Sequence, residues 1–253
     1  MLADAWIVML KEWREVLFRG MGAKGSVGFF GLIVVVFGIA IPWRSGAFWV
    51  TIPWSAITWA WLPLMLVMAV VADSFAGERE RHTLETLLAS RLSDASILLG
   101  KVAAAVVFAW GMLLLVAVMS LATVNITVMR PHPWTHLLLW RWEETFGVVG
   151  LGLLFTVLCA TIGVMVSLRS ETVRQANLRL SMGLILFFPA VLLALAGIYS
   201  VLPATVQLTL LDWVQTWQSG PVMFAITAVL VGIDALLLWL SSRMFVRNRL
   251  MLD

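Results

Sequence analysis

The densest group of polar residues in this sequence lies between residues 73 and 101, and it is the first candidate for chemistry. A charged run there passes into a stripe of leucines: Glu78, Arg79, Glu80, Arg81, Thr83, Leu84, Glu85, Leu87 and Leu88. The pair Gly100-Lys101 does not complete a phosphate-binding loop, because that loop needs Gly at position 95 and Ser or Thr at position 102, where the chain has Ala and Val. ATP is therefore not expected to bind by this route. The leucines share one helical face, which indicates a short helix that needs a partner.

Two histidines close together could bind a metal or a haem iron. His132 and His136 are four residues apart, so one helix turn would aim both imidazoles at the same ion. Pro131 and Pro133 disfavour a regular helix there, and a third ligand is not evident. We therefore expect interfacial polar residues and neither metal nor cofactor, with the handling of haem as the alternative.

Familiar catalytic patterns are not met elsewhere in the sequence. The pair Glu143-Glu144 is followed by Val148, where intramembrane glutamate proteases carry Arg, and Gly-x-Ser-x-Gly does not occur. The single cysteine, Cys159, excludes an intrachain disulfide. No catalytic residue is expected, and the chain is interpreted as a protein that is not itself an enzyme.

One carboxylate, Asp234, lies well inside an otherwise apolar run. Burying it unpaired within a membrane costs several kcal/mol, so it is expected to be neutral, paired, or facing a wet cavity. Contact with a substrate or ion is one interpretation. A structural hydrogen bond between helices or subunits is the other, and the sequence favours it.

Composition places all these residues in a membrane protein. Of 253 residues, 62% are hydrophobic and only 12% are charged, whereas soluble domains carry roughly 25% charged residues. The same composition excludes an intrinsically disordered chain. The net charge of +3 does not indicate nucleic acid as a partner, because basic residues of a membrane protein first report its topology. The lipid bilayer is the expected surrounding.

Six apolar runs are each long enough to cross a bilayer once, since a spanning helix needs about 20 residues. Apart from Asp234 they contain no Asp, Glu, Lys or Arg, and they cover residues 25–43, 45–72, 102–129, 145–168, 180–211 and 213–242. The predicted fold class is therefore an all-α membrane protein with six transmembrane helices. These helices form one domain, expected at residues 25–253.

The preceding segment, residues 1–24, is predicted to contain an amphipathic helix over residues 2–19. Its apolar stripe repeats at helical spacing, at Trp6, Leu10, Trp13 and Leu17. Its opposite side is charged, at Lys11, Glu12, Glu15 and Arg19. Such a helix is too polar to span and is expected to lie in the membrane interface. The alternative is a soluble helix packed on another subunit.

Basic residues divide unequally between the two sides of the predicted spans. Of the 17 Lys and Arg, 14 fall in the termini and loops of one side and three on the other. Because Lys and Arg concentrate in cytoplasmic segments, this division predicts that both termini are cytoplasmic. Ten of the 14 tryptophans fall near the outer ends, as expected for an interfacial aromatic belt.

Over residues 78–101 the sequence resembles the permease subunits of the ATP-binding-cassette (ABC) type-2 transporter family. Members of that family carry an acidic-Arg-Glu tract, then Thr-Leu-Glu, then a Leu-Leu pair, and a Gly-Lys that opens the third span. The matching positions here are Glu78-Arg79-Glu80-Arg81, Thr83-Leu84-Glu85, Leu87-Leu88 and Gly100-Lys101. Two residues depart from the pattern: His82 stands where Gly is usual, and Arg91 where Pro is common.

The resemblance implies a permease that works with separate cytoplasmic ATPase subunits in a bacterial-type cytoplasmic (inner) membrane. A second copy of the chain, or a related permease, would complete the pathway as a homodimer or heterodimer. Export is implied as well, and the Trp-rich outer face favours a lipidic or amphipathic substrate. The alternatives are a secondary transporter or channel that needs no ATPase, and a haem-handling ABC permease.

The same resemblance implies that residues 78–92 form the coupling helix, within a coupling loop at about 78–94. ATP would bind in the partner, so a rigid piece of this chain has to carry the partner's motion to the spans. The leucines at 84, 87 and 88 would fill an apolar cleft on the ATPase. Glu80 and Glu85 would meet basic residues at the rim of that cleft.

Overall fold

The computed structural model describes residues 2–18, 22–51, 55–129, 137–140, 142–215 and 219–245. All regular structure in these ranges is helical, and none of it is strand. In chain order the elements are α1 (Leu2–Phe18), α2 (Gly22–Ile33), η1 (Val34–Ala40), α3 (Ile41–Ser45), α4 (Phe48–Thr51), α5 (Ser55–Val71), α6 (Ala76–Glu80), α7 (Leu84–Leu88), α8 (Asp94–Met129), α9 (Trp142–Phe146), η2 (Gly147–Leu151), α10 (Gly152–Leu168), α11 (Val173–Val201), α12 (Ala204–Gln215) and α13 (Ser219–Met244), of which η1 and η2 are π-helical. The predicted all-α class is confirmed.

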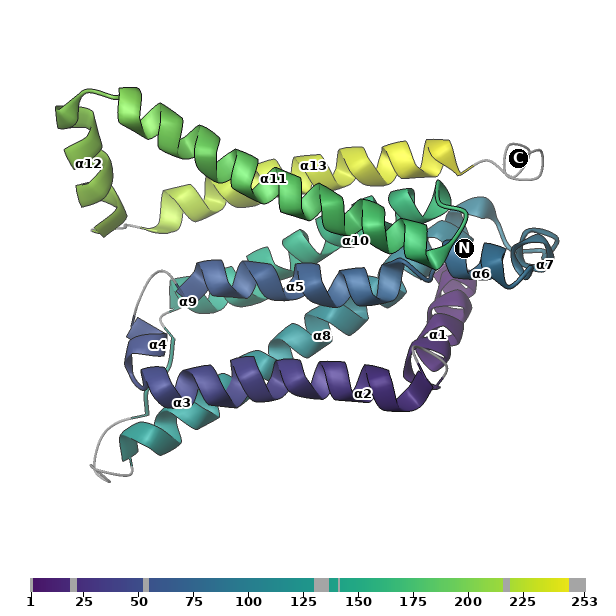
Figure 1. Cartoon of the computed structure of the whole chain (residues 1–253), viewed down its shortest axis with the longest axis horizontal. Helices are drawn as coiled ribbons and strands as arrows, with labels where there is room; N and C mark the ends of the chain where they lie inside the picture. The colour runs from purple at the N-terminus through teal and green to yellow at the C-terminus, as the bar shows by residue number, and fades with distance from the viewer. Residues whose placement is uncertain are drawn as a thin grey trace.

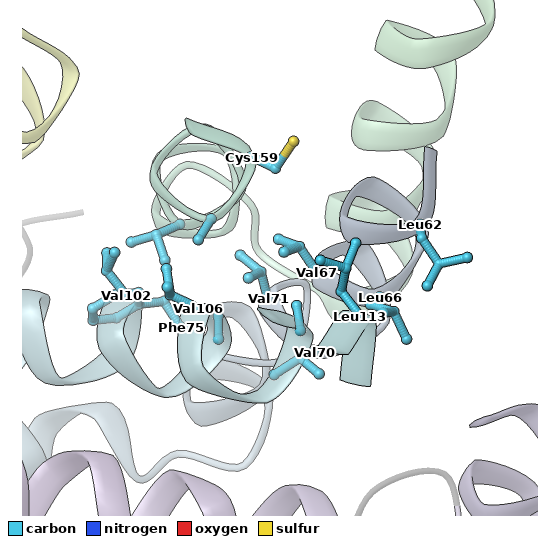
Figure 2. Packing of buried hydrophobic residues seen from close by; sticks show 14 of the residues in the cluster. Leu62, Leu66, Val67, Val70, Val71, Phe75, Val102, Val106, Leu113 and Cys159 are labelled. Atoms are coloured by element: carbon cyan, nitrogen blue, oxygen red, sulfur yellow. The ribbon is translucent and has the colours of Figure 1, made fainter. Parts of the chain in front are cut away.

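The core lies where α5, α8 and α10 pack together. Figure 2 shows its buried side chains as one cluster, with Leu66 and Val71 from α5, Val106 and Leu113 from α8, and Cys159 from α10. A Cβ on Gly163 of α10 would lie 2.7 Å from Cγ1 of Val71. The absence of a side chain at that position therefore lets α5 and α10 approach closely, as small residues do between membrane helices.

Four stretches are long and apolar enough to cross a membrane: Gly28–Ser45, Asp94–Met129, Gly147–Leu168 and Phe224–Met244. They coincide with the first, third, fourth and sixth predicted spans. The second predicted span is shorter than expected, because the chain turns at Gly46 (φ +55°) and α5 holds only 17 residues, or about 26 Å of helix. The structure thus shows an all-helical membrane protein with four candidate spans among its described residues.

The fifth apolar run, residues 180–211, is divided between two helices. Helix α11 ends at Val201, and Leu202 takes an extended conformation with ψ 144° before α12 begins at Ala204. Pro203 is the physical reason, because its ring disfavours helical backbone in the residue before it and it cannot donate to the preceding turn.

The short helices gather at the two ends of the long ones. Figure 1 shows α1, α6 and α7 at the end where α13 finishes, and α4, α9 and α12 at the opposite end. Helix α1 packs chiefly on the beginning of α8, and α6 packs on the beginning of α11. The first of these ends brings together most of the residues that the sequence singled out.

Candidate coupling site

Helix α1 is confirmed over Leu2–Phe18, and the side it buries is not its apolar stripe. Trp6 and Leu10 are 59% and 43% exposed, whereas Val8 and Glu12 are buried against α8. A Cβ on Gly100 would lie 2.6 Å from Cβ of Val8 and 2.8 Å from the carbonyl oxygen of Ala5. Only a glycine lets the two helices cross this closely. Trp6 and Leu10 of the stripe are left facing outward, as an interfacial helix requires, whereas Trp13 is half-buried and its Nε1 donates to the carbonyl oxygen of Ala104 on α8 at 3.2 Å.

At this crossing the ammonium group of Lys101 is completely buried. Its Nζ donates to Glu12 Oε1 at 2.6 Å and to the carbonyl oxygen of Ser74 at 2.6 Å, and it lies 3.3 Å from Glu78 Oε1. A lysine has three N–H donors, so these three oxygens can satisfy it completely. Nζ also lies 4.8 Å from the centre of the Phe75 ring, within the range of a cation–π contact.

A second lysine extends the group to four residues, Lys11, Glu12, Glu78 and Lys101, which we call the Lys101 cluster. Lys11 Nζ donates to Glu78 Oε1 at 2.7 Å. Burial raises the pKa of Glu12 above its ordinary value, because loss of water outweighs the attraction of Lys101. Burial would lower the pKa of Lys11, but the hydrogen bond and charge of Glu78 together raise it. The cluster joins α1, α6 and α8 through charges that are largely out of water.

Helix α6 is also attached to the C-terminal end of α10. The buried hydroxyl of Ser167 accepts hydrogen bonds from the backbone N–H groups of Phe75 (3.1 Å) and Ala76 (3.0 Å), and it donates to the carbonyl oxygen of Ala72 at 3.2 Å. Arg79 donates to the carbonyl oxygens of Ser170 (2.7 Å) and Leu168 (3.3 Å). A cation is favoured there, because the last carbonyls of a helix carry a partial negative charge.

The next contact runs from α6 to the start of α11. Glu80 Oε2 accepts a hydrogen bond from the backbone N–H of Val173, the first residue of that helix. The N-terminus of a helix attracts a carboxylate through its free N–H groups and its dipole. Thr172 caps the same helix by accepting from the N–H of Gln175 at 3.2 Å. Through α6 the coupling loop therefore touches α8, α10 and α11.

A tight turn separates α6 from α7. His82 adopts φ +56°, a left-handed conformation that costs a residue with a Cβ about 1–2 kcal/mol. This geometry explains why glycine is usual at the matching position of the resembling family. Beyond the turn, Thr83 donates from its hydroxyl to the carbonyl oxygen of Glu78 at 3.3 Å, which ties the start of α7 back to α6.

The structure brings the predicted coupling residues into one loop but divides them between its inside and its surface. Glu78 is 2% exposed and Leu84 is 7% exposed, and Leu84 packs in the protein's own core together with the half-buried Leu87. The side chain of Leu88 lies outside the described part. Glu80, Arg81, Thr83 and Glu85 are on the surface. The expectation that Leu84 fills a cleft on a partner is therefore corrected, because its side chain is already occupied within this chain.

Arg81 lies at the edge of this surface. Its guanidinium bonds the carboxylate of Asp73 at 3.2–3.3 Å and lies 4.0 Å from Glu15 of α1. Both partners of the Asp73 pair are nearly half exposed, so this pair is screened by water. At the start of α8, the Ser93 hydroxyl accepts from the N–H of Ser96 at 3.2 Å and caps the helix.

The remaining candidates lie away from this loop. Asp234 is on α13, is 5% exposed, and has no hydrogen-bond partner on either oxygen among the described residues. His132 and His136 lie outside the described residues. Within the described ranges, no group of three His, Cys, Asp or Glu side chains is placed to hold a metal ion.

Sequence reasoning missed the pairing of Glu12 with Lys101, which are 89 positions apart. Glu12 was assigned to the solvated side of its helix, and Lys101 was counted among the topology signals. The motif Gly100-Lys101 was the available signal, since both of its residues serve the contact with α1.

Two comparisons with known proteins bear on this arrangement. A family model described as "ABC-2 family transporter protein" matches residues 55–218. The matched range runs from the start of α5 to beyond α12, and it includes the whole coupling loop. No curated protein matches the chain significantly.

Proposed function

The chain belongs to the ABC-2 transporter family, and from this premise we propose that it is a permease driven by a separate cytoplasmic ATPase through residues 78–92. A membrane subunit of an ABC transporter is what the family itself implies. The proposal adds the route by which the ATPase moves the permease. It also adds export as the direction and a lipidic or amphipathic molecule as the substrate class.

One observation carries the proposed route: α6 is bonded to three helices at once. It reaches α8 through Glu78 and Lys101, α10 through Arg79 and Ser167, and α11 through Glu80. A displacement of α6 would therefore move α8, α10 and α11 together, because charged and hydrogen-bonded contacts hold these three helices to α6. A flexible surface loop without such contacts could not transmit motion in this way.

The surface available to an ATPase is polar. It is formed by the exposed side chains of Glu80, Arg81, Thr83, Glu85 and Thr86. The leucine stripe contributes indirectly, since Leu84 and Leu87 join the loop to the core. We propose that Glu85 contacts a basic residue of the ATPase, because it is exposed and its carboxylate has no ion pair with the described residues.

Charge reversal at Glu85 tests the docking surface. We expect Glu85→Lys to reduce co-purification of the ATPase several-fold at low salt, with a smaller effect at high salt, because rim charges act mainly on association and are screened. Glu171→Lys is the matched control, since Glu171 is an exposed carboxylate in the loop that joins α10 to α11. Equal co-purification for wild type and Glu85→Lys at low salt would remove Glu85 from the interface.

The proposed topology has six spans and cytoplasmic termini, with α5 and α11 as the two additional spans. The predicted cytoplasmic residue Thr86 lies in α7, and Gln175 lies in the first turn of α11, the helix whose start contacts α6. Figure 1 shows α6 and α7 at one end of the molecule. This arrangement supports the proposal, because the coupling helix that we propose at residues 78–92 has to face an ATPase in the cytoplasm. A bacterial-type inner membrane is the proposed location.

Cysteine labelling in intact cells measures the topology. Introduced cysteines at Thr86 and Gln175 should react with an impermeant maleimide only after permeabilisation, and those at Thr135 and Ser219 should react from outside. The native Cys159 gives little background because it is only 7% exposed. Labelling of Thr86→Cys in intact cells would reverse the proposed orientation.

A homodimer is the proposed assembly. Only 11% of the apolar stretch of α13 is buried within the chain. Helix α11 exposes large apolar residues such as Leu186 and Leu193. These faces are open to lipid or to a second permease. A related permease as the second subunit would make a heterodimer, which mass measurement of the purified complex distinguishes.

A further inference from the structure

Asp234 occupies the middle of the last candidate span. It is ten residues from each end of Phe224–Met244, which places it about 15 Å from both ends of that apolar stretch of α13. The other Asp, Glu, Lys and Arg residues of the four candidate spans lie nearer to a helix end: Arg44, Asp94, Lys101 and Arg243. A carboxylate at mid-membrane depth is costly, and such residues usually mark a functional site.

The described residues offer this carboxylate no hydrogen bond. Asp234 is 5% exposed, and neither Oδ1 nor Oδ2 has a hydrogen-bond partner among the described residues. The structural hydrogen bond between helices that the sequence favoured is therefore not found within the described part of the chain.

The helix around this side chain is partly exposed. Asp234 is buried on α13, the helix that packs on α10, while the neighbouring Ile233 and Leu236 are 39% and 55% exposed. The buried carboxylate thus has exposed apolar side chains next to it on the same helix. A molecule that binds between α10 and α13 would contact apolar side chains and one carboxylate.

Deepening the proposed transport function, on which this inference rests, we propose that Asp234 binds the protonated amine of an amphipathic substrate. A carboxylate accepts several hydrogen bonds, and a primary ammonium group donates three. An inorganic cation is a poorer match, because Ca²⁺ takes six to eight oxygen ligands and Mg²⁺ about six. An organic cation also has an apolar part, which can pack against the apolar side chains around Asp234.

Equilibrium binding to the purified permease in lipid nanodiscs tests the assignment without any ATPase. The probes are radiolabelled dodecylamine and its neutral analogue dodecanol, measured on wild type, Asp234→Asn and Asp234→Glu. We expect saturable amine binding that falls at least tenfold in Asp234→Asn, equivalent to about 1.4 kcal/mol, and that stays within a few-fold in Asp234→Glu. Dodecanol binding should be the same for all three proteins.

Two controls separate this site from other effects. Glu171→Gln removes an exposed carboxylate and should leave amine binding unchanged. Thermal stability and subunit mass of Asp234→Asn, with ATPase co-purification measured separately, show whether the variant is folded and assembled. Failure of the ATPase to co-purify would count against the proposed function and not against the amine site.

Three results would overturn the assignment. Equal amine affinity in wild type and Asp234→Asn would place the amine elsewhere. Absence of saturable binding to wild type would show that the site does not take amines. Dissociation of Asp234→Asn into single subunits, with amine binding intact, would make Asp234 a contact with a second copy of the chain.

Discussion

The variant Lys101→Met is expected to lower the free energy of unfolding by about 3–5 kcal/mol, the usual cost of breaking a buried ion pair. The side chain of Lys101 is completely buried, and its loss leaves Glu12 and Glu78 without the cation that lies 2.6 Å and 3.3 Å from them. For a chain of this size, 1 kcal/mol corresponds to roughly 2–4 °C in melting temperature, so a decrease of about 10 °C is expected. Thermal unfolding of the purified protein in detergent measures it.

The matched control is Arg81→Met, which also removes a cation near α6. Its pair with Asp73 is nearly half exposed on both sides, so the expected cost is below about 1 kcal/mol. Adding Glu12→Gln to Lys101→Met should restore part of the loss, because it removes one of the two unpaired charges. Similar melting temperatures for Lys101→Met and Arg81→Met would mean that the cluster contributes no more than a surface pair.

The stability deficit of Lys101→Met should also depend on pH. Burial already raises the pKa of Glu12 with Lys101 present, and removing Lys101 raises it further. A carboxyl whose pKa is higher in the folded state costs stability as pH rises through the interval between its unfolded and folded values. The gap between wild type and variant should therefore be smaller in mild acid than at neutral pH.

Local patterns of the sequence predicted the fold class and several element boundaries. Run length and apolar content anticipated four candidate spans, and spacing anticipated α1 to within one residue of its observed end at Phe18. The serine cap of α8 was readable because Ser93 precedes a long apolar run. These features depend on residues close together in the chain, which is why sequence reasoning reaches them.

Contacts between distant segments could not be predicted in the same way. Lys101 lies 89 positions from Glu12 and 23 from Glu78, and nothing in the order of residues says which carboxylates a buried lysine will meet. For the leucine stripe, the sequence indicated a contact but not the identity of the partner. Its spacing correctly indicated that it needs a partner, but the partner of Leu84 is the core of the same chain and not another protein.

The Ser167 hydroxyl is one of the contacts that hold α6 to α10, and the variant Ser167→Ala is expected to weaken the attachment. The Ser167 hydroxyl serves two backbone N–H groups, those of Phe75 and Ala76, and also the carbonyl oxygen of Ala72. An unsatisfied buried polar group costs about 1–3 kcal/mol, so two N–H donors left without a partner correspond to a loss of roughly 2–6 kcal/mol. Backbone amides 75 and 76 should then exchange hydrogen faster, which mass spectrometry of the peptide containing them measures.

The matched control for this change is Ser120→Ala on α8. Ser120 is equally buried, but its hydroxyl donates only to the carbonyl oxygen of Ala117 in its own helix. Its removal should therefore change stability little and leave exchange at residues 75 and 76 as in wild type. If coupling passes through α6, Ser167→Ala should also uncouple ATP hydrolysis from transport while ATPase co-purification persists, because the docking surface at Glu85 is untouched. Unchanged amide exchange in Ser167→Ala would show that α6 is held to α10 by Arg79 and the apolar core instead, and the loop would then transmit force through those contacts.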